Sequence, residues 1–70
     1  MMTDKQRASL DEVRDARTRV IANGGRASVL VAKAETLIEM FDSMPRQVLG
    51  LRVVVDERVE DGVFWVGEFE

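Results

Sequence analysis

Apolar side chains recur at helical spacing over residues 4–22. The members of this pattern fall on one arc at about 100° per residue, and they are Leu10, Val13, Val20 and Ile21. Charged side chains occupy the opposite face, and Asn-Gly-Gly follows at 23–25. These three residues accept the left-handed backbone at which helices end. The pattern therefore predicts an amphipathic helix over 4–22.

A second apolar pattern covers residues 27–44, where the spacing alternates between three and four. Its members are Ala27, Leu30, Ala34, Leu37, Phe41 and Met44. This spacing predicts a second helix with a broad apolar stripe, which ends before Pro45. The first helix has too narrow a stripe to cover it alone. We therefore expect the C-terminal segment or a second copy of the chain to pack there.

β-Branched residues dominate the remainder of the chain. Residues 51–59 and 63–69 predict two strands, and Asp61–Gly62 between them is typical of a two-residue hairpin turn. The expected fold is therefore α+β, a helical hairpin followed by a β-hairpin in the order ααββ. The whole chain, 1–70, is expected to form a single domain.

A hairpin closed at Asp61–Gly62 would place Arg58 opposite Trp65. Strand alternation then puts Phe64 and Val66 on the core side of the hairpin. The opposite face presents an apolar patch among charges, consisting of Val54, Arg58, Val63, Trp65 and Phe69. Such a patch is typical of a contact surface, with tryptophan as its anchor. In the alternative interpretation, Arg58 simply covers the Trp65 ring as a cation–π pair and no partner is involved.

The length and composition of the chain favour association. Seventy residues bury a small core, which is usually supplemented by disulfides, metal ions or a partner. The sequence has no cysteine and no histidine, so disulfides and the commonest zinc ligands are excluded. Association remains, and we expect a homodimer.

Candidate catalytic groups are sparse. The serines have no histidine to activate them, and Lys5 and Lys33 lie on polar faces, so we expect no enzymatic activity and no cofactor. The carboxylates at Glu35, Glu39 and Asp42 lack a loop that would wrap a cation, and we expect no metal site. The stretch Asn-Gly-Gly-Arg-Ala-Ser lacks the preceding strand and the lysine of a phosphate-binding loop.

Arg17 lies within the apolar arc of the first predicted helix. Its guanidinium can extend to water from the rim of the core. In the alternative interpretation it forms a buried ion pair with Glu57 or Glu68, or with a second copy of the chain, because an unpaired buried charge is costly.

Charge and hydropathy restrict the class of partner. Residues 51–70 contain two basic and six acidic side chains, which disfavours nucleic acid. Neither a signal peptide nor a membrane-spanning stretch is evident, so a cytoplasmic location is expected. The sequence favours a non-catalytic protein–protein interaction module, an adaptor or inhibitor that acts as a homodimer. The alternatives are a structural subunit of a larger assembly and, less favoured, a nucleic-acid-binding regulator.

Overall fold

The computed structural model describes residues 3–68, which form a mixed α+β fold with two helices and one four-stranded sheet. The elements in chain order are α1 Asp4–Ala22, β1 Val29–Ala32, α2 Ala34–Phe41, β2 Gln47–Val48, β3 Leu51–Val55 and β4 Phe64–Gly67. The predicted mixture of helices and strands is confirmed. The predicted ααββ order is wrong, because a strand precedes α2 and the helices do not form a hairpin.

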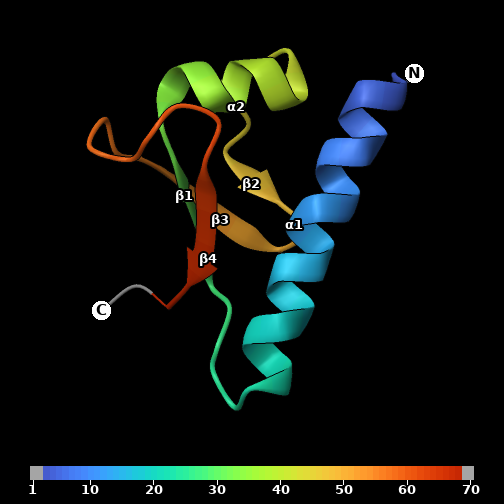
Figure 1. Ribbon diagram of the computed structural model, residues 1–70, viewed down its shortest axis with the longest axis vertical. Helices are drawn as coiled ribbons and strands as arrows, with labels where there is room; N and C mark the ends of the chain where they lie inside the picture. The colour runs from blue at the N-terminus through green and yellow to red at the C-terminus, as the bar shows by residue number, and fades with distance from the viewer. Residues whose placement is uncertain (1–2, 69–70) are drawn as a thin grey trace.

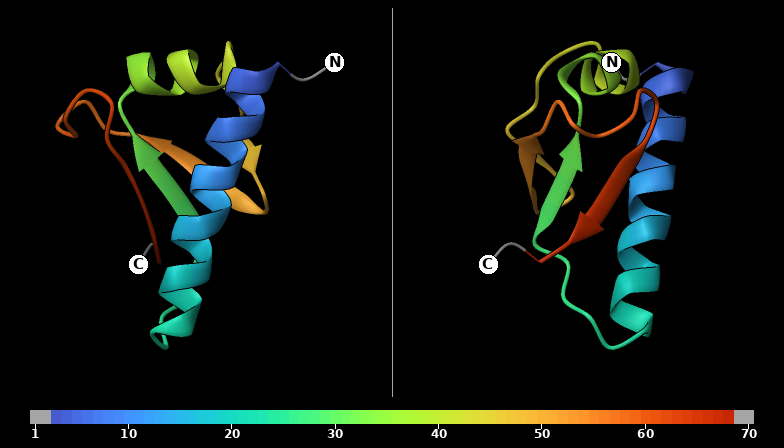
Figure 2. Two further views of the ribbon diagram at one scale, coloured as in Figure 1. Left: turned by 45° about the vertical axis from the view of Figure 1, so that its right-hand side comes forward. Right: turned by 60° about the vertical axis from the view of Figure 1, so that its left-hand side comes forward.

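Strand β1 lies inside the sheet, whose order is β2-β3-β1-β4. β1 is parallel to β3 and antiparallel to β4, so Val31 lies between Val54 and Trp65. Figure 1 shows α1 along one side of the sheet and α2 across one end of it. The views in Figure 2 agree with this arrangement and show no helix on the other side.

Helix α1 begins and ends where the sequence predicted. The hydroxyl of Thr3 accepts a hydrogen bond from the Gln6 amide, and the Gln6 side chain accepts one from the Thr3 amide. This capping box satisfies two amides that the first turn leaves without helical partners. Gly24, at φ +84°, follows the C-terminal end. The Gln6 side chain also donates to the carbonyl oxygen of Phe41 at 2.8 Å, which ties α1 to the end of α2.

The predicted helix over 27–44 is wrong. Residues 29–32 form β1, and α2 covers only Ala34–Phe41. All four residues of β1 are buried, as is common for a strand that lies between two others in a sheet. Such a strand shows no alternation, so its apolar residues also matched a helical repeat. Helix α2 ends at Asp42 in the left-handed conformation, φ 56°, before Pro45 is reached.

The predicted β-hairpin is also wrong. β3 and β4 are not neighbours, because β1 lies between them and pairs with both. Residues 56–63, expected to complete the first strand, form the turn and begin the second strand, instead connect β3 to β4 across the end of β1. Gly62 adopts φ +76°, so the predicted turn at Asp61–Gly62 exists, but it belongs to this longer connection.

The core lies between α1, α2 and one face of the sheet. Its buried members are Val13, Leu30, Ala32, Leu37, Phe41, Val48 and Leu51, and the partly buried Val53, Phe64 and Val66 pack against them. The expected core positions Phe64 and Val66 are thus placed correctly, although by pairing with β1. Neither of the two helices in residues 3–68 combines the length and apolar content that crossing a membrane requires.

Candidate interaction surfaces

A row of three side chains crosses the face of the sheet away from α1. Val54 on β3 and Trp65 on β4 both lie opposite Val31 of β1, and paired residues project to the same face. The neighbouring residues Val53 and Val66 project to the α1 side. We call the set Val54, Val31 and Trp65 the Trp65 row. Its middle is buried, whereas Trp65 is 52% exposed.

Val54 and Trp65 share one face, as strand alternation predicts, but they do so by pairing with Val31 and not with each other's strand. Other members of the predicted surface lie elsewhere. Arg58 is exposed in the connection after β3, and the expected cross-strand pair with Trp65 is wrong because Val31 occupies that position. Val63 is 42% exposed just before β4. Phe69 lies outside the described residues.

Asp56 binds Arg58 in place of the expected contact with Trp65. The Asp56 carboxylate accepts hydrogen bonds from the Arg58 backbone amide at 2.9 Å and from its guanidinium at 2.9 and 3.1 Å. The hydrogen bonds from the Arg58 side chain are the largest cause of a lowered pKa at Asp56. Together with the bond from the backbone amide, they lower this pKa to about 2. The same contact raises the pKa of Arg58. The pair fixes the first turn of the β3–β4 connection.

Three contacts hold the β3–β4 connection against the start of α2. The Glu57 carboxylate accepts from the Ala34 amide, and Thr36 Oγ1 accepts from the Gly62 amide, both at 3.0 Å. Lys33 Nζ lies 3.0 Å from Asp61 Oδ1, and this hydrogen bond raises the pKa of Lys33. These partners are far apart in the sequence, and no local pattern indicates them.

The ion pair predicted within one chain, between Arg17 and Glu57 or Glu68, is not buried, whereas a pair with a second copy stays a prediction. Arg17, Glu57 and Glu68 are all exposed, so the Arg17 guanidinium has no need of a buried partner. This agrees with the other interpretation of Arg17, a side chain that reaches water from the rim. Glu57 instead accepts the hydrogen bond from the α2 amide of Ala34, where a carboxylate is favoured by the helix dipole.

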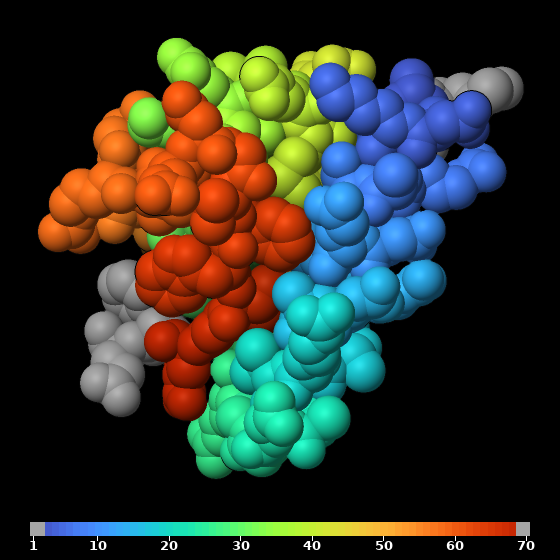
Figure 3. Space-filling model, in the orientation of Figure 1, coloured from blue at the N-terminus to red at the C-terminus, as the bar shows by residue number. Residues whose placement is uncertain are grey.

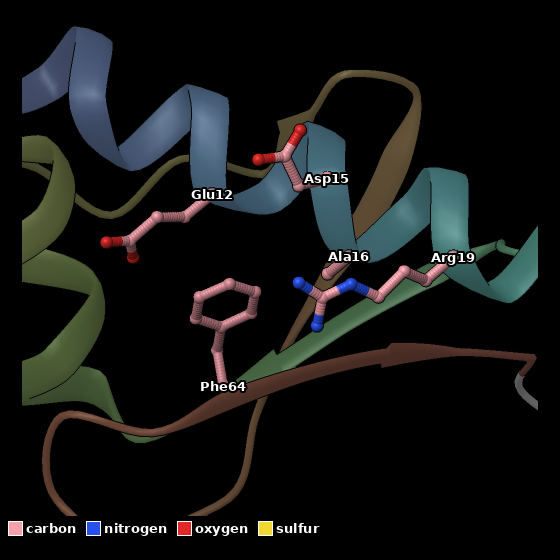
Figure 4. Close-up of a pocket in the computed structure, with 5 residues that line it drawn as sticks. All are labelled: Glu12, Asp15, Ala16, Arg19 and Phe64. Carbon is pink, nitrogen blue, oxygen red and sulfur yellow. The ribbon is translucent and has the colours of Figure 1, made fainter.

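A groove of about 340 Å³ lies at the surface between α1 and β4. Glu12, Asp15, Ala16 and Arg19 line its α1 side, and Phe64 of β4 lines the other (Figure 4). Glu12 lies toward the start of β4, and the Arg19 guanidinium extends beside the Phe64 ring. In Figure 3 the atoms of β4 lie at the surface directly beside those of α1. No pattern in the sequence indicates this groove, because it requires β4 to lie next to α1.

The two edges of the sheet differ in their protection. β2 has two residues, follows Pro45, and is succeeded by Leu49 and Gly50 at positive φ, which limits any further pairing at that edge. β4 forms the other edge with the sequence Phe-Trp-Val-Gly, which contains neither proline nor charge. The β4 edge therefore offers an uninterrupted apolar strand to another polypeptide.

Groups suited to metal binding are scattered. Within residues 3–68, no three acidic side chains come close enough together to hold a cation. Glu35, Glu39 and Asp42 are exposed, as expected for a solvated helix face.

Comparison with known proteins gives no family. No protein-family model matches the sequence, and neither curated proteins nor solved structures show significant similarity to it. The function must therefore be argued from the two surfaces described above.

Proposed function

We propose that the protein is a non-catalytic, cytoplasmic protein–protein interaction module that acts as a homodimer, with the Trp65 row as the contact between the copies. The observation that supports this most directly is the 52% exposure of Trp65, the only tryptophan of the chain. Aromatic side chains of this size anchor protein interfaces when a partner covers them.

The arrangement around Trp65 suits self-association. Val54 is partly exposed on the same face, the buried Val31 lies between it and Trp65, and the two helices lie elsewhere. A two-fold axis through this face would set the Trp65 row of one copy against that of the other. Sheets pack face to face in this manner in many domains, at about 10 Å separation.

The apolar side of α2 needs no second copy of the chain to cover it. The sequence suggested that a broad stripe on the second helix needs a partner, but Leu37 and Phe41 are covered by their own chain. Ile38 on the same helix is 47% exposed, and exposed apolar side chains are common on folded proteins. The proposal therefore depends on the Trp65 row alone.

Sedimentation velocity at about 100 μM tests the proposal, because a dimer with a Kd of about 1 μM or below is then largely formed. We expect a dimer for the native chain and a monomer with unchanged circular dichroism for Trp65→Ala. Ile21→Ala is the matched control, since Ile21 is also 52% exposed but lies at the end of α1. This control should remain dimeric.

A native chain that sediments as a monomer under these conditions would refute the homodimer. A dimer that survives Trp65→Ala would place the contact elsewhere and would also contradict the proposal. Assemblies that grow beyond a dimer with concentration would support a structural subunit instead.

A further inference from the structure

We propose that the groove between α1 and β4 binds an extended peptide segment of another protein, which adds to the sheet as a fifth strand beside β4. The inference rests on the proposed function in so far as the protein acts by binding polypeptides, and it names the chemistry of the partner. It uses the edge of β4 and the groove beside it, whereas the homodimer uses the sheet face that carries Trp65, so different variants test the two proposals.

The edge of β4 provides the first reason. β4 pairs with β1 on one side only, so the outward backbone groups of Phe64–Gly67 have no neighbouring strand in the sheet. An edge strand of this kind binds an added strand through main-chain hydrogen bonds, while pockets beside it select the side chains. The two-residue β2, with Pro45 before it, makes the opposite edge a poor site for the same addition.

The groove beside that edge provides the second reason. Its volume, about 340 Å³, is sufficient for a few side chains. A strand laid along β4 would lie about 4.8 Å from it, and every second side chain would enter the groove. Ala16 leaves space on the helix, and the half-buried Phe64 provides an apolar wall, so the central groove-facing residue should be aliphatic.

The charges of the groove select the flanking residues. Glu12 and Asp15 form no salt bridge with any other part of residues 3–68, and neither does Arg19. Glu12 and Arg19 are seven residues apart, about 10 Å along the helix. Residues four apart in a strand share a face and span about 13 Å, which long side chains can match. A peptide with a basic and an acidic residue at this spacing would complement Glu12 at one end of the groove and Arg19 at the other.

The direction of the added strand follows from the course of α1 and β4. Both run in the same general direction in Figure 1, with Glu12 beside the start of β4 and Arg19 further along. Antiparallel pairing is slightly more stable per residue than parallel pairing. A peptide antiparallel to β4 would meet Arg19 first and Glu12 last, so its acidic residue should precede its basic one.

A blocked peptide, Thr-Glu-Thr-Val-Thr-Lys-Thr, carries this pattern and serves as the probe. We expect it to shift the amide resonances of β4 and of the α1 residues that line the groove in an ¹⁵N-labelled sample. The control peptide Thr-Lys-Thr-Val-Thr-Glu-Thr has the same composition with the charges exchanged, and it should bind at least about tenfold more weakly, the effect of losing one charge-assisted contact.

Two variants of the protein complete the test. Arg19→Glu should weaken binding of the probe at least about tenfold, because it places a third carboxylate in the groove. Arg17→Glu makes the same charge change on the same helix outside the groove, and it should bind as the native chain does. Circular dichroism of both variants should match the native spectrum, since both side chains are exposed.

Three results would overturn the inference: no shift of the β4 amides at millimolar peptide, equal binding of both peptides, or equal binding to both variants. Sedimentation of the same samples separates this failure from that of the proposed function. If a second copy occupied the β4 edge, Arg19→Glu rather than Trp65→Ala would dissociate the dimer, which would contradict both proposals. A peptide-binding monomer would contradict the homodimer alone.

Discussion

Thr36 Oγ1 accepts a hydrogen bond from the backbone amide of Gly62 at 3.0 Å, across 26 residues of sequence. Thr36 is 2% exposed and lies in the first turn of α2, whereas Gly62 lies in the connection that leads to β4. The contact therefore couples the start of a short helix to the placement of the edge strand. Serine and threonine often form such side-chain bonds where the backbone cannot pair with itself.

Replacing Thr36 by valine should reduce the free energy of unfolding by about 1 kcal/mol, because the Gly62 amide loses its acceptor. Urea denaturation followed by circular dichroism would measure this change. Thr18→Val is the control, since Thr18 is exposed on α1 and bonds only within its helix. The control should change stability by less than about 0.5 kcal/mol. Equal effects would show that the Gly62 contact contributes nothing specific.

Leu37 and Ile38 are adjacent on α2 and differ completely in exposure, 0% against 47%. Leu37→Ala should destabilise the fold by about 2–5 kcal/mol, because it leaves a cavity in the core cluster. Ile38→Ala should have a much smaller effect, since its side chain already contacts water. Chemical denaturation of both variants would check the order, and a larger loss for Ile38 would contradict the described packing.

The contribution of the α1 capping box to the stability of the fold should be measurable on its own. Thr3→Ala removes the acceptor of the Gln6 amide and should destabilise the fold by about 1 kcal/mol. Thr3→Ser keeps a hydroxyl at the same position and should retain most of that stability. Thermal unfolding of the two variants side by side would test the prediction, and indistinguishable melting temperatures would count against the cap.

The Asp56–Arg58 contact predicts that the Asp56 carboxyl group titrates at a pH well below the usual range of aspartate. The pKa of Asp56 is lowered to about 2, and an ordinary aspartate titrates near about 3.9. Since the folded-state pKa is the lower one, the stability that this carboxylate adds is complete above about pH 4 and is lost as the pH falls toward 2. Carboxyl carbon shifts in an NMR titration would report the pKa directly.

Arg58→Ala removes the guanidinium and should raise the pKa of Asp56 toward its ordinary value, because the largest cause of the shift is the side-chain hydrogen bond. Arg52→Ala is a suitable control, since Arg52 is exposed on β3 and forms no salt bridge within residues 3–68. An Asp56 pKa that remains near 2 without Arg58 would disprove the assigned cause.

Features that depend on neighbouring residues were predicted best from the sequence. Helix α1 was predicted with its bounds because its apolar arc, its polar face and the glycines after it are all local. The face of Val54 and of Trp65 was also predicted, since alternation along a strand assigns a side chain to one face whichever strand pairs with it. That is why a wrong hairpin still gave a correct face for these two residues.

Features that depend on distant pairing could not be predicted. Val29–Ala32 is buried on both faces, and a short apolar run of this kind fits a helix or a strand equally well. The insertion of β1 between β3 and β4 then changed the partner of Trp65 from Arg58 to Val31. The groove at Phe64 could not be predicted for the same reason, because it requires α1 and β4 to be adjacent.

The position of β1 between two later strands has a consequence for biosynthesis. Until residues 51–55 have been translated, β1 has neither neighbour, and until residues 64–67 follow, one side of it stays uncovered. Parallel and long-range strand pairing forms slowly for the same reason, since distant segments must first meet. A chain that ended before Phe64 would therefore leave one side of β1, whose four residues are all buried in the complete fold, open to pairing with other polypeptides.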